Sequence, residues 1–119
     1  MGRIIMVKTV LTSATILAFT VSAALAAGSA SLGKTLFNDP KFAGAMSGKS
    51  CNTCHPGGRG LEQAGSKKEF HIAGKAQKSL EEAVNACIVY AIDGKALDPK
   101  SDAMQNIVAY IKSLKSNRT

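Results

Sequence analysis

Apolar side chains recur at helical spacing in three separate stretches of the chain. The first stretch, residues 28–39, places Leu32, Leu36 and Phe37 on one face of a helix, and the Asp-Pro pair at its end stops the pattern. No stretch shows the alternation of apolar and polar residues that is typical of a half-buried strand. The pattern therefore predicts a helical protein.

The second predicted helix occupies residues 79–94. It begins with Ser79 and Glu82 at capping-box spacing and ends at Gly94, a residue type that often follows the last helical turn. Its apolar face carries Leu80, Val84, Cys87, Ile88 and Ala91. We expect this face to be buried, with the Cys87 thiol among aliphatic side chains.

The third predicted helix lies within residues 99–115 and has Ser101 as its N-cap. Its apolar stripe consists of Met104, Ile107, Val108, Ile111 and Leu114. Lys112 and Lys115 lie in the last turns, where positive charge complements the helix dipole. This segment is the most regular of the three.

Residues 56–78 are rich in Gly, Lys and Ser and show no lasting periodicity, so they predict a long loop. A loop of this length in a small domain usually wraps around something. The expected fold class is all-α, with few helices and long loops.

The first 26 residues have the features of a secretory leader. Arg3 and Lys8 precede the mostly apolar stretch "VLTSATILAFTV", and Ala24-Leu25-Ala26 fits the rule for signal-peptide cleavage. The alternative, a retained membrane anchor, is disfavoured by the Thr and Ser residues within that stretch. We expect residues 1–26 to be cleaved and residues 27–119 to form one domain. That domain would lie in the periplasm or an equivalent compartment, without membrane attachment.

The chain has a formal net charge of +7, and the leader carries two basic and no acidic side chains, so cleavage leaves +5. The remaining lysines are scattered and are not interleaved with aromatic residues, and export separates the chain from nucleic acid. We therefore expect no nucleic-acid partner, and the charge suits solubility or an acidic protein partner. No Ser/His/Asp set or carboxylate pair predicts catalysis, so we do not expect an enzyme.

The stretch "SCNTCHPGG", residues 50–58, contains two of the three cysteines. Cys51, Cys54 and His55 form a C-x-x-C-H motif, which is the attachment signature of c-type haem. The two thiols add to the haem vinyl groups as thioethers, and the histidine becomes the proximal iron ligand. Export agrees with this assignment, because covalent haem attachment takes place outside the cytoplasm. The motif predicts one covalent haem c.

Two other kinds of site compete for the same motif. A structural zinc site would need a second pair of ligands, whereas Cys87 and His71 are single and far apart in the sequence. A thioredoxin-like redox pair would need a βαβ context, which the pattern does not provide. Both alternatives are weaker than haem.

The order of features resembles that of class I c-type cytochromes over nearly all of residues 30–115. The features are a short helix containing "GKTLF", an early CxxCH, a long loop, and a C-terminal helix containing "AYIKSL". The resemblance implies that the terminal helices cross, with Gly33 and Phe37 meeting Tyr110. It also implies a methionine as sixth iron ligand, in a loop well before the last helix. The corresponding stretch here, "DGKALDPK", contains no methionine.

Three side chains are candidates for the distal ligand. Met104 would keep the usual His/Met pair, but a methionine in a helical apolar stripe is usually part of the core. His71 would give a bis-histidine site, although such a histidine is more often at the surface or near a haem propionate. Cys87 is the one cysteine outside the CxxCH motif and has no partner for a disulfide within this exported chain. If it is not the ligand, it would be a buried inert thiol or form an intermolecular disulfide.

The stretch "VNACIVYAIDGKALDPKSDAMQNIVAYIKSL" also resembles the haem domains of thiosulfate dehydrogenases and SoxA cytochromes. It is similar, too, to the small paired monohaem cytochromes of anaerobic ammonium oxidisers, the NaxL/NaxS type. In these families a cysteine thiolate is the distal ligand, and the match is carried by Cys87, Gly94, Met104 and Tyr110. The resemblance favours Cys87 as the distal ligand and implies a second small cytochrome as the partner in a heterodimer.

A thiolate ligand stabilises ferric iron and lowers the haem potential, whereas methionine raises it. We therefore expect a cytochrome that transfers electrons at low potential, binds a diatomic gas such as nitric oxide or carbon monoxide, or does both. The alternative is an ordinary His/Met electron-transfer cytochrome c. A thiosulfate-oxidising enzyme fits less well, because the enzymes that the chain resembles use two haems and this chain has one CxxCH.

Overall fold

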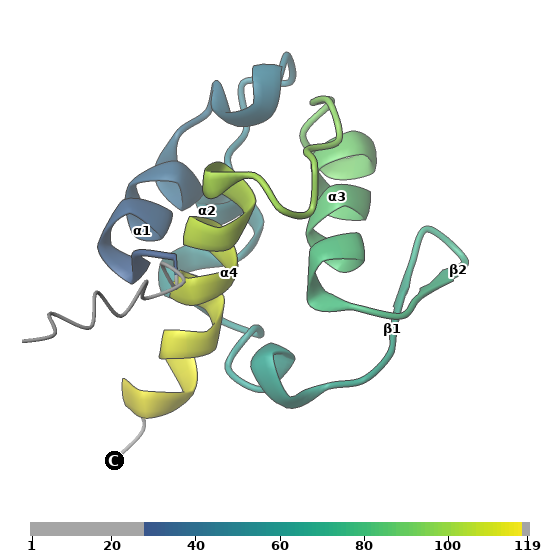
Figure 1. The fold of residues 1–119 in the computed structure, drawn as a ribbon. Helices are drawn as coiled ribbons and strands as arrows, with labels where there is room; N and C mark the ends of the chain where they lie inside the picture. Colours follow the sequence, from purple (N-terminus) through teal and green to yellow (C-terminus); the bar gives the residue numbers. More distant parts are fainter. Residues whose placement is uncertain (1–27, 118–119) are drawn as a thin grey trace, which may run out of the picture.

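The computed structural model describes residues 28–117, so the predicted leader and its cleavage site lie outside the described residues. Four α-helices and one short β-hairpin make up the regular structure of this part (Figure 1). The helices are α1 (Ala30–Asn38), α2 (Cys51–Cys54), α3 (Leu80–Ala91) and α4 (Asp102–Ser113). Single 3₁₀ turns lie at Phe42–Gly44, Pro56–Gly58, Ala64–Ser66 and Leu114–Asn117. The prediction of a helix-rich protein is confirmed.

Helix α1 packs along α4, and a glycine makes this contact close. A Cβ atom added to Gly33 would lie 1.9 Å from the carbonyl oxygen of Asn106 and 2.8 Å from the Cβ of Tyr110. One turn later, the Phe37 and Tyr110 rings meet edge to face, with their centroids 5.0 Å apart. The predicted meeting of Gly33 and Phe37 with Tyr110 is thus confirmed.

The predicted stripe of α4 forms the centre of the core. Met104 and Ile107 are fully buried, and Val108, Ile111 and Leu114 are nearly so. Ser101 caps the helix as expected, since its hydroxyl accepts a hydrogen bond from the Met104 N–H at 3.3 Å. The side chains that the 3.6-residue period placed on one face therefore do face the interior.

Helix α3 also starts as predicted, with one difference at its cap. The Ser79 hydroxyl accepts from the Glu82 N–H at 3.1 Å, as in a capping box. The Glu82 carboxylate, however, accepts from the N–H of Lys78 at 2.7 Å and not from that of Ser79. The cap is formed, but its return bond is shifted by one residue.

The segment predicted as an unstructured loop contains a hairpin, and the prediction of no strand was wrong there. Strands β1 (Phe70–Ile72) and β2 (Lys75–Gln77) pair antiparallel, with Phe70 opposite Gln77. Three-residue strands are too short to leave a visible alternation in the sequence. The connecting residues Ala73 and Gly74 both have positive φ, of 52° and 74°, which is usually signalled by Asn-Gly and not by Ala-Gly.

Backbone hydrogen bonds tie the chain before CxxCH to the end of α3. The Met46 N–H donates to the Asp93 carbonyl at 3.1 Å, and the Lys95 N–H donates to the Ala43 carbonyl at 2.8 Å. The Asn85 side chain bonds both backbone groups of Leu97, each at 2.8 Å, and so holds the following loop against α3. These bonds fix α3 relative to the segment that carries the motif.

No helix among residues 28–117 is long and apolar enough to cross a membrane.

Candidate cofactor-binding cleft

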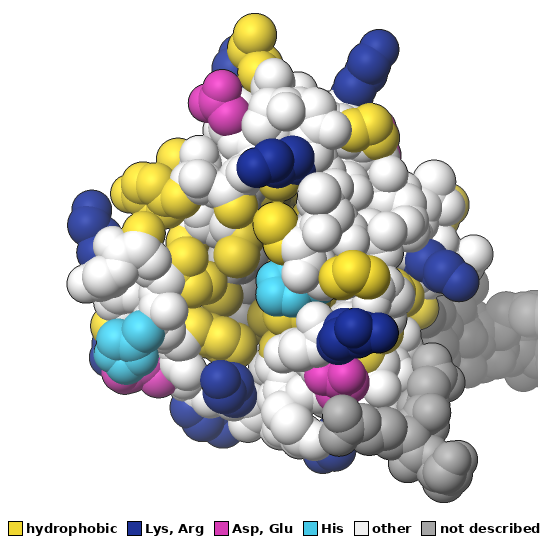
Figure 2. Space-filling view, turned by 180° about the vertical axis from the view of Figure 1, so that it is seen from behind, with side chains coloured by type: hydrophobic (Ala, Val, Ile, Leu, Met, Phe, Trp, Pro, Cys, Tyr) yellow, Lys and Arg dark blue, Asp and Glu magenta, His cyan; other side chains and the backbone are white. Residues whose placement is uncertain are grey.

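An apolar cleft opens between α2, α3, α4 and strand β1. The face of the molecule that carries it is visibly hollowed, with hydrophobic side chains gathered around the hollow (Figure 2). Its walls include Phe37, Phe70, Leu80, Ile107 and Ile111. An almost wholly apolar lining of this kind is typical of small-molecule and cofactor sites.

Both cysteines of the CxxCH motif line this cleft. Helix α2 is a single turn made of the motif itself, so Cys51 and Cys54 lie three residues apart on one face. The turn is fixed by Ser50, whose N–H donates to the Thr53 hydroxyl at 3.0 Å in a capping box. The local structure thus presents two thiols side by side to an apolar space.

His55 also borders the cleft, and its tautomer follows from its hydrogen bond. The Nδ1 atom lies 3.0 Å from the carbonyl oxygen of Arg59. Because a carbonyl can only accept, Nδ1 carries the proton and Nε2 keeps a free lone pair. Bonds of this kind orient the imidazole of metal-binding histidines. In the neutral ring, Nε2 is then the nitrogen that could bind a metal.

The fold brings Cys87 of α3 to the same cleft. Burial raises the pKa of Cys51 to about 11, and the neighbouring Cys87 adds to the shift. Burial likewise raises the pKa of Cys87, with a further contribution from Cys54. The partly buried thiols of Cys51 and Cys87 therefore stay protonated at neutral pH unless a metal ion binds the sulfur.

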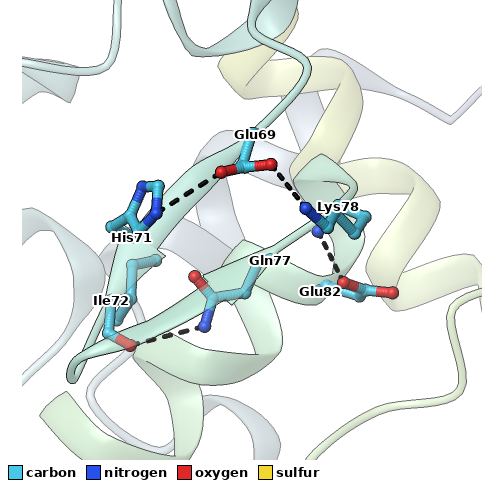
Figure 3. A network of polar contacts seen from close by, with 6 residues as sticks. All are labelled: Glu69, His71, Ile72, Gln77, Lys78 and Glu82. Carbon is cyan, nitrogen blue, oxygen red and sulfur yellow. Dashed lines mark hydrogen bonds and ion pairs between the residues drawn. The ribbon is translucent and has the colours of Figure 1, made fainter.

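The other two candidate ligands lie elsewhere. Met104 is fully buried in the core and is not part of the cleft wall. His71 points away from the cleft, since its side chain is 71 % exposed and its Nε2 lies 3.4 Å from the Glu69 carboxylate (Figure 3). The strand alternation explains this, because Phe70 and Ile72 on either side of His71 both face the cleft.

Within residues 28–117, no three His, Cys, Asp or Glu side chains converge closely enough to hold a bare metal ion. The argument against a structural zinc site was that Cys87 and His71 are single and far apart in the sequence. In the fold, Cys87 nevertheless lines the same cleft as the CxxCH motif. The cleft lining does contain one imidazole, of His55, and three thiols, of Cys51, Cys54 and Cys87, among apolar side chains.

The sequence pattern did not identify the apolar wall of the cleft. Phe70 and Ile72 belong to strand β1, which was not predicted because three residues are too few to show an alternation. Ile107 and Ile111 were assigned to the core alone, yet they also border the cleft.

Comparison with known proteins gave no matching family model, no matching curated protein and no matching solved structure.

Proposed function

We propose that the protein is an exported monohaem c-type cytochrome with His/Cys axial ligation. Cys51 and Cys54 would hold the haem as thioethers, His55 would be the proximal ligand and Cys87 the distal ligand. The observation that carries the proposal is that the CxxCH motif and Cys87, which are far apart in the sequence, line one apolar cleft.

The residues around the cleft suit a covalent haem in their chemistry. The lining is aliphatic and aromatic apart from the sulfur atoms, His55 and Ser50, as expected for contact with a porphyrin face. The Arg59 carbonyl would fix the His55 ring, and the α2 turn would keep both thioether positions on one edge. Phe70 and Ile72 of the hairpin would keep water from this side of the cofactor.

When bound, the haem would supply a one-electron redox centre and an iron able to bind a diatomic gas. A Cys87 thiolate would stabilise the ferric state, so the protein would work at low potential. We infer that its role is binding of a gas such as nitric oxide or carbon monoxide, low-potential electron transfer, or both. A second small cytochrome is the proposed partner, consistent with the excess of basic side chains.

The alternative is an ordinary His/Met cytochrome with Met104 as distal ligand. Met104 is fully buried and does not border the cleft. To bind the iron, its side chain would have to leave the core position beside Ile107. That rearrangement would leave a cavity at a fully buried core position. The position of Cys87 therefore favours the thiolate reading.

Intact mass spectrometry of protein produced with a haem-attachment system tests the proposal. The wild type should carry one covalent haem, and Cys51→Ala or Cys54→Ala should give apoprotein or a single-thioether product. Cys87→Ser serves as the matched control, since it removes a cleft thiol while leaving both attachment sites. A wild-type protein that never gains the haem mass would overturn the proposal.

A further inference from the structure

The cleft has an apolar wall on its hairpin side. Ala64, Phe70 and Ile72 supply this part of the wall, whereas Cys51 and Cys54 line the cleft from α2. In Figure 1 the hairpin lies to the right of α3 and α2 lies to its left, so the two segments border the cleft from different sides. A flat cofactor attached to α2 would therefore extend its free edge toward the hairpin.

Lys67 brings a positive charge to this hairpin side. Its Nζ atom lies over the Phe70 ring, 5.8 Å from the ring centroid, an arrangement in which the aromatic face attracts a cation. Phe70 is part of the cleft wall, whereas the Lys67 side chain is exposed. The contact therefore holds an ammonium group at the rim of the cleft. Single polar groups placed in this way orient a ligand in a mostly apolar site.

The ammonium group of Lys67 is open to an anionic partner. Its neighbour Glu69 pairs with Lys78 and His71 instead (Figure 3). Within residues 28–117, no ion pair joins Lys67 to a carboxylate. The charge at the rim is therefore not neutralised by this part of the chain.

Two further lysines increase the positive charge around Lys67. Lys68 follows it in the sequence, and Lys112 packs against the preceding turn, since a Cβ added to Gly65 would lie 3.1 Å from the Lys112 Cγ. Positive charge gathered at one side of an apolar cleft attracts an anionic group of the occupant. The hairpin side is therefore suited to a carboxylate.

We propose that the Lys67 ammonium group binds a carboxylate of the cofactor. This inference rests on the proposed function, because haem carries two propionates, on the half of the porphyrin ring away from its vinyl groups. With the vinyl carbons joined to Cys51 and Cys54, the propionates would lie toward the hairpin. Lys67 would then donate a charge-assisted hydrogen bond to a propionate oxygen and fix the orientation of the cofactor in the cleft.

Equilibrium binding of two synthetic haems to the full-length apoprotein tests this pairing. Iron mesoporphyrin IX has ethyl groups in place of the vinyl groups and cannot form thioethers, so its binding stays reversible. Its dimethyl ester lacks the two carboxylate charges as well. Titrations followed at the Soret band give the ratio of the two Kd values. We expect the wild type to bind the diacid about tenfold more tightly than the diester.

Three variants assign this preference to one side chain. Lys67→Gln should reduce the preference for the diacid about fivefold, the size expected for loss of one partly solvated ion pair. Lys67→Arg should keep the preference, because it keeps the charge. Lys68→Gln is the matched control: it removes the same charge from the adjacent position and should leave the preference within about twofold of the wild type.

The ratio separates recognition of the carboxylate from support of the wall. An unchanged preference in Lys67→Gln, or an equal drop in Lys68→Gln, would overturn the assignment. If Lys67→Gln weakened binding of the diacid and the diester equally, Lys67 would only support Phe70, and the proposal would be wrong. A wild type that bound neither synthetic haem would overturn the proposed function and this inference with it, whereas the other results leave the proposed function standing.

Discussion

The two sides of the molecule bury apolar side chains in different ways. Helices α1 and α4 pack directly against each other. The Gly33 backbone contacts the Asn106 backbone, and the Phe37 ring packs edge to face against the Tyr110 ring. Between α3, α2 and the hairpin, apolar side chains line an open cleft. The first side is packed by the protein alone, whereas the proposed haem would cover the apolar lining of the second. Substitutions at the helix contact should therefore change the free energy of unfolding, and substitutions in the cleft should change the attachment and the spectrum of the haem.

The largest effect is expected on the cleft side. Replacing both Cys51 and Cys54 by Ala should abolish covalent haem altogether, because no thioether can then form. Absorbance and intact mass measure the loss. Cys87→Ser should keep the covalent haem, and loss of haem in this variant as well would mean that the cleft depends on Cys87 for attachment.

On the α1–α4 side, Gly33→Ala should reduce the free energy of unfolding by about 3 kcal/mol, since the new Cβ would overlap the Asn106 carbonyl. Denaturant unfolding of the holoprotein measures it. Gly65→Ala is the matched control, because its Cβ would come no closer than 3.1 Å to Lys112, compared with 1.9 Å to the Asn106 carbonyl oxygen for Gly33. A loss as large in Gly65→Ala would show that the effect is not specific to the helix contact.

The cleft thiols supply a test that depends on pH. At pH 8 the Cys51 thiol of the apoprotein should be alkylated about 100-fold more slowly than a thiol with the ordinary pKa, since only the thiolate reacts. The alkylation rate should rise as the pH approaches 11, the pKa of the Cys51 thiol, because a growing fraction of the thiol is then deprotonated. Mass spectrometry of timed samples measures it, and alkylation at the ordinary rate would show that Cys51 is not enclosed.

Met104→Leu should separate the core from the cleft. It should lower the free energy of unfolding by about 1 kcal/mol, as expected for a volume-conserving swap at a fully buried position. The haem absorption spectrum should not change, because Met104 does not border the cleft. A change in the absorption bands that depend on the axial ligand would indicate that Met104 binds the iron.

The smallest effect is expected for His71→Ala, which removes only an exposed pairing with Glu69. The free energy of unfolding should change by less than about 0.5 kcal/mol. The spectrum should stay that of the wild type. A spectral shift would mean that the hairpin turns inward when the cofactor binds.

The last helix could be predicted because its apolar side chains follow a regular period and its cap is local: the stripe of Met104 and Ile107 and the Ser101 cap match the structure. The first helix was predicted less well, since Leu32 of its expected apolar face is 57 % exposed. The Gly33 contact also matches, but it was implied by the resemblance and not by the period. The hairpin could not be predicted, since its strands are three residues long and its Ala73-Gly74 turn lacks the usual residues.

The site was predictable in part for a similar reason. The CxxCH motif is contiguous, so Cys51, Cys54 and His55 could be identified from spacing alone. The position of Cys87 beside them depends on how α3 packs, through the bonds of Met46 with Asp93, and periodicity does not encode that packing. The hydrogen bond from His55 to the Arg59 carbonyl likewise depends on the turn that follows the motif.

Absorption spectra of the ferric and the dithionite-reduced holoprotein, compared among wild type, Cys87→Met, Cys87→Ser and Met104→Leu, test the central claim most directly. We predict that the wild type and Met104→Leu share a red-shifted ferric Soret band. Cys87→Met should shift this band to the blue and raise the potential, because the iron would lose an anionic ligand. If Met104→Leu abolished the native spectrum and Cys87→Ser left it unchanged, the distal ligand would be methionine and the account would be wrong.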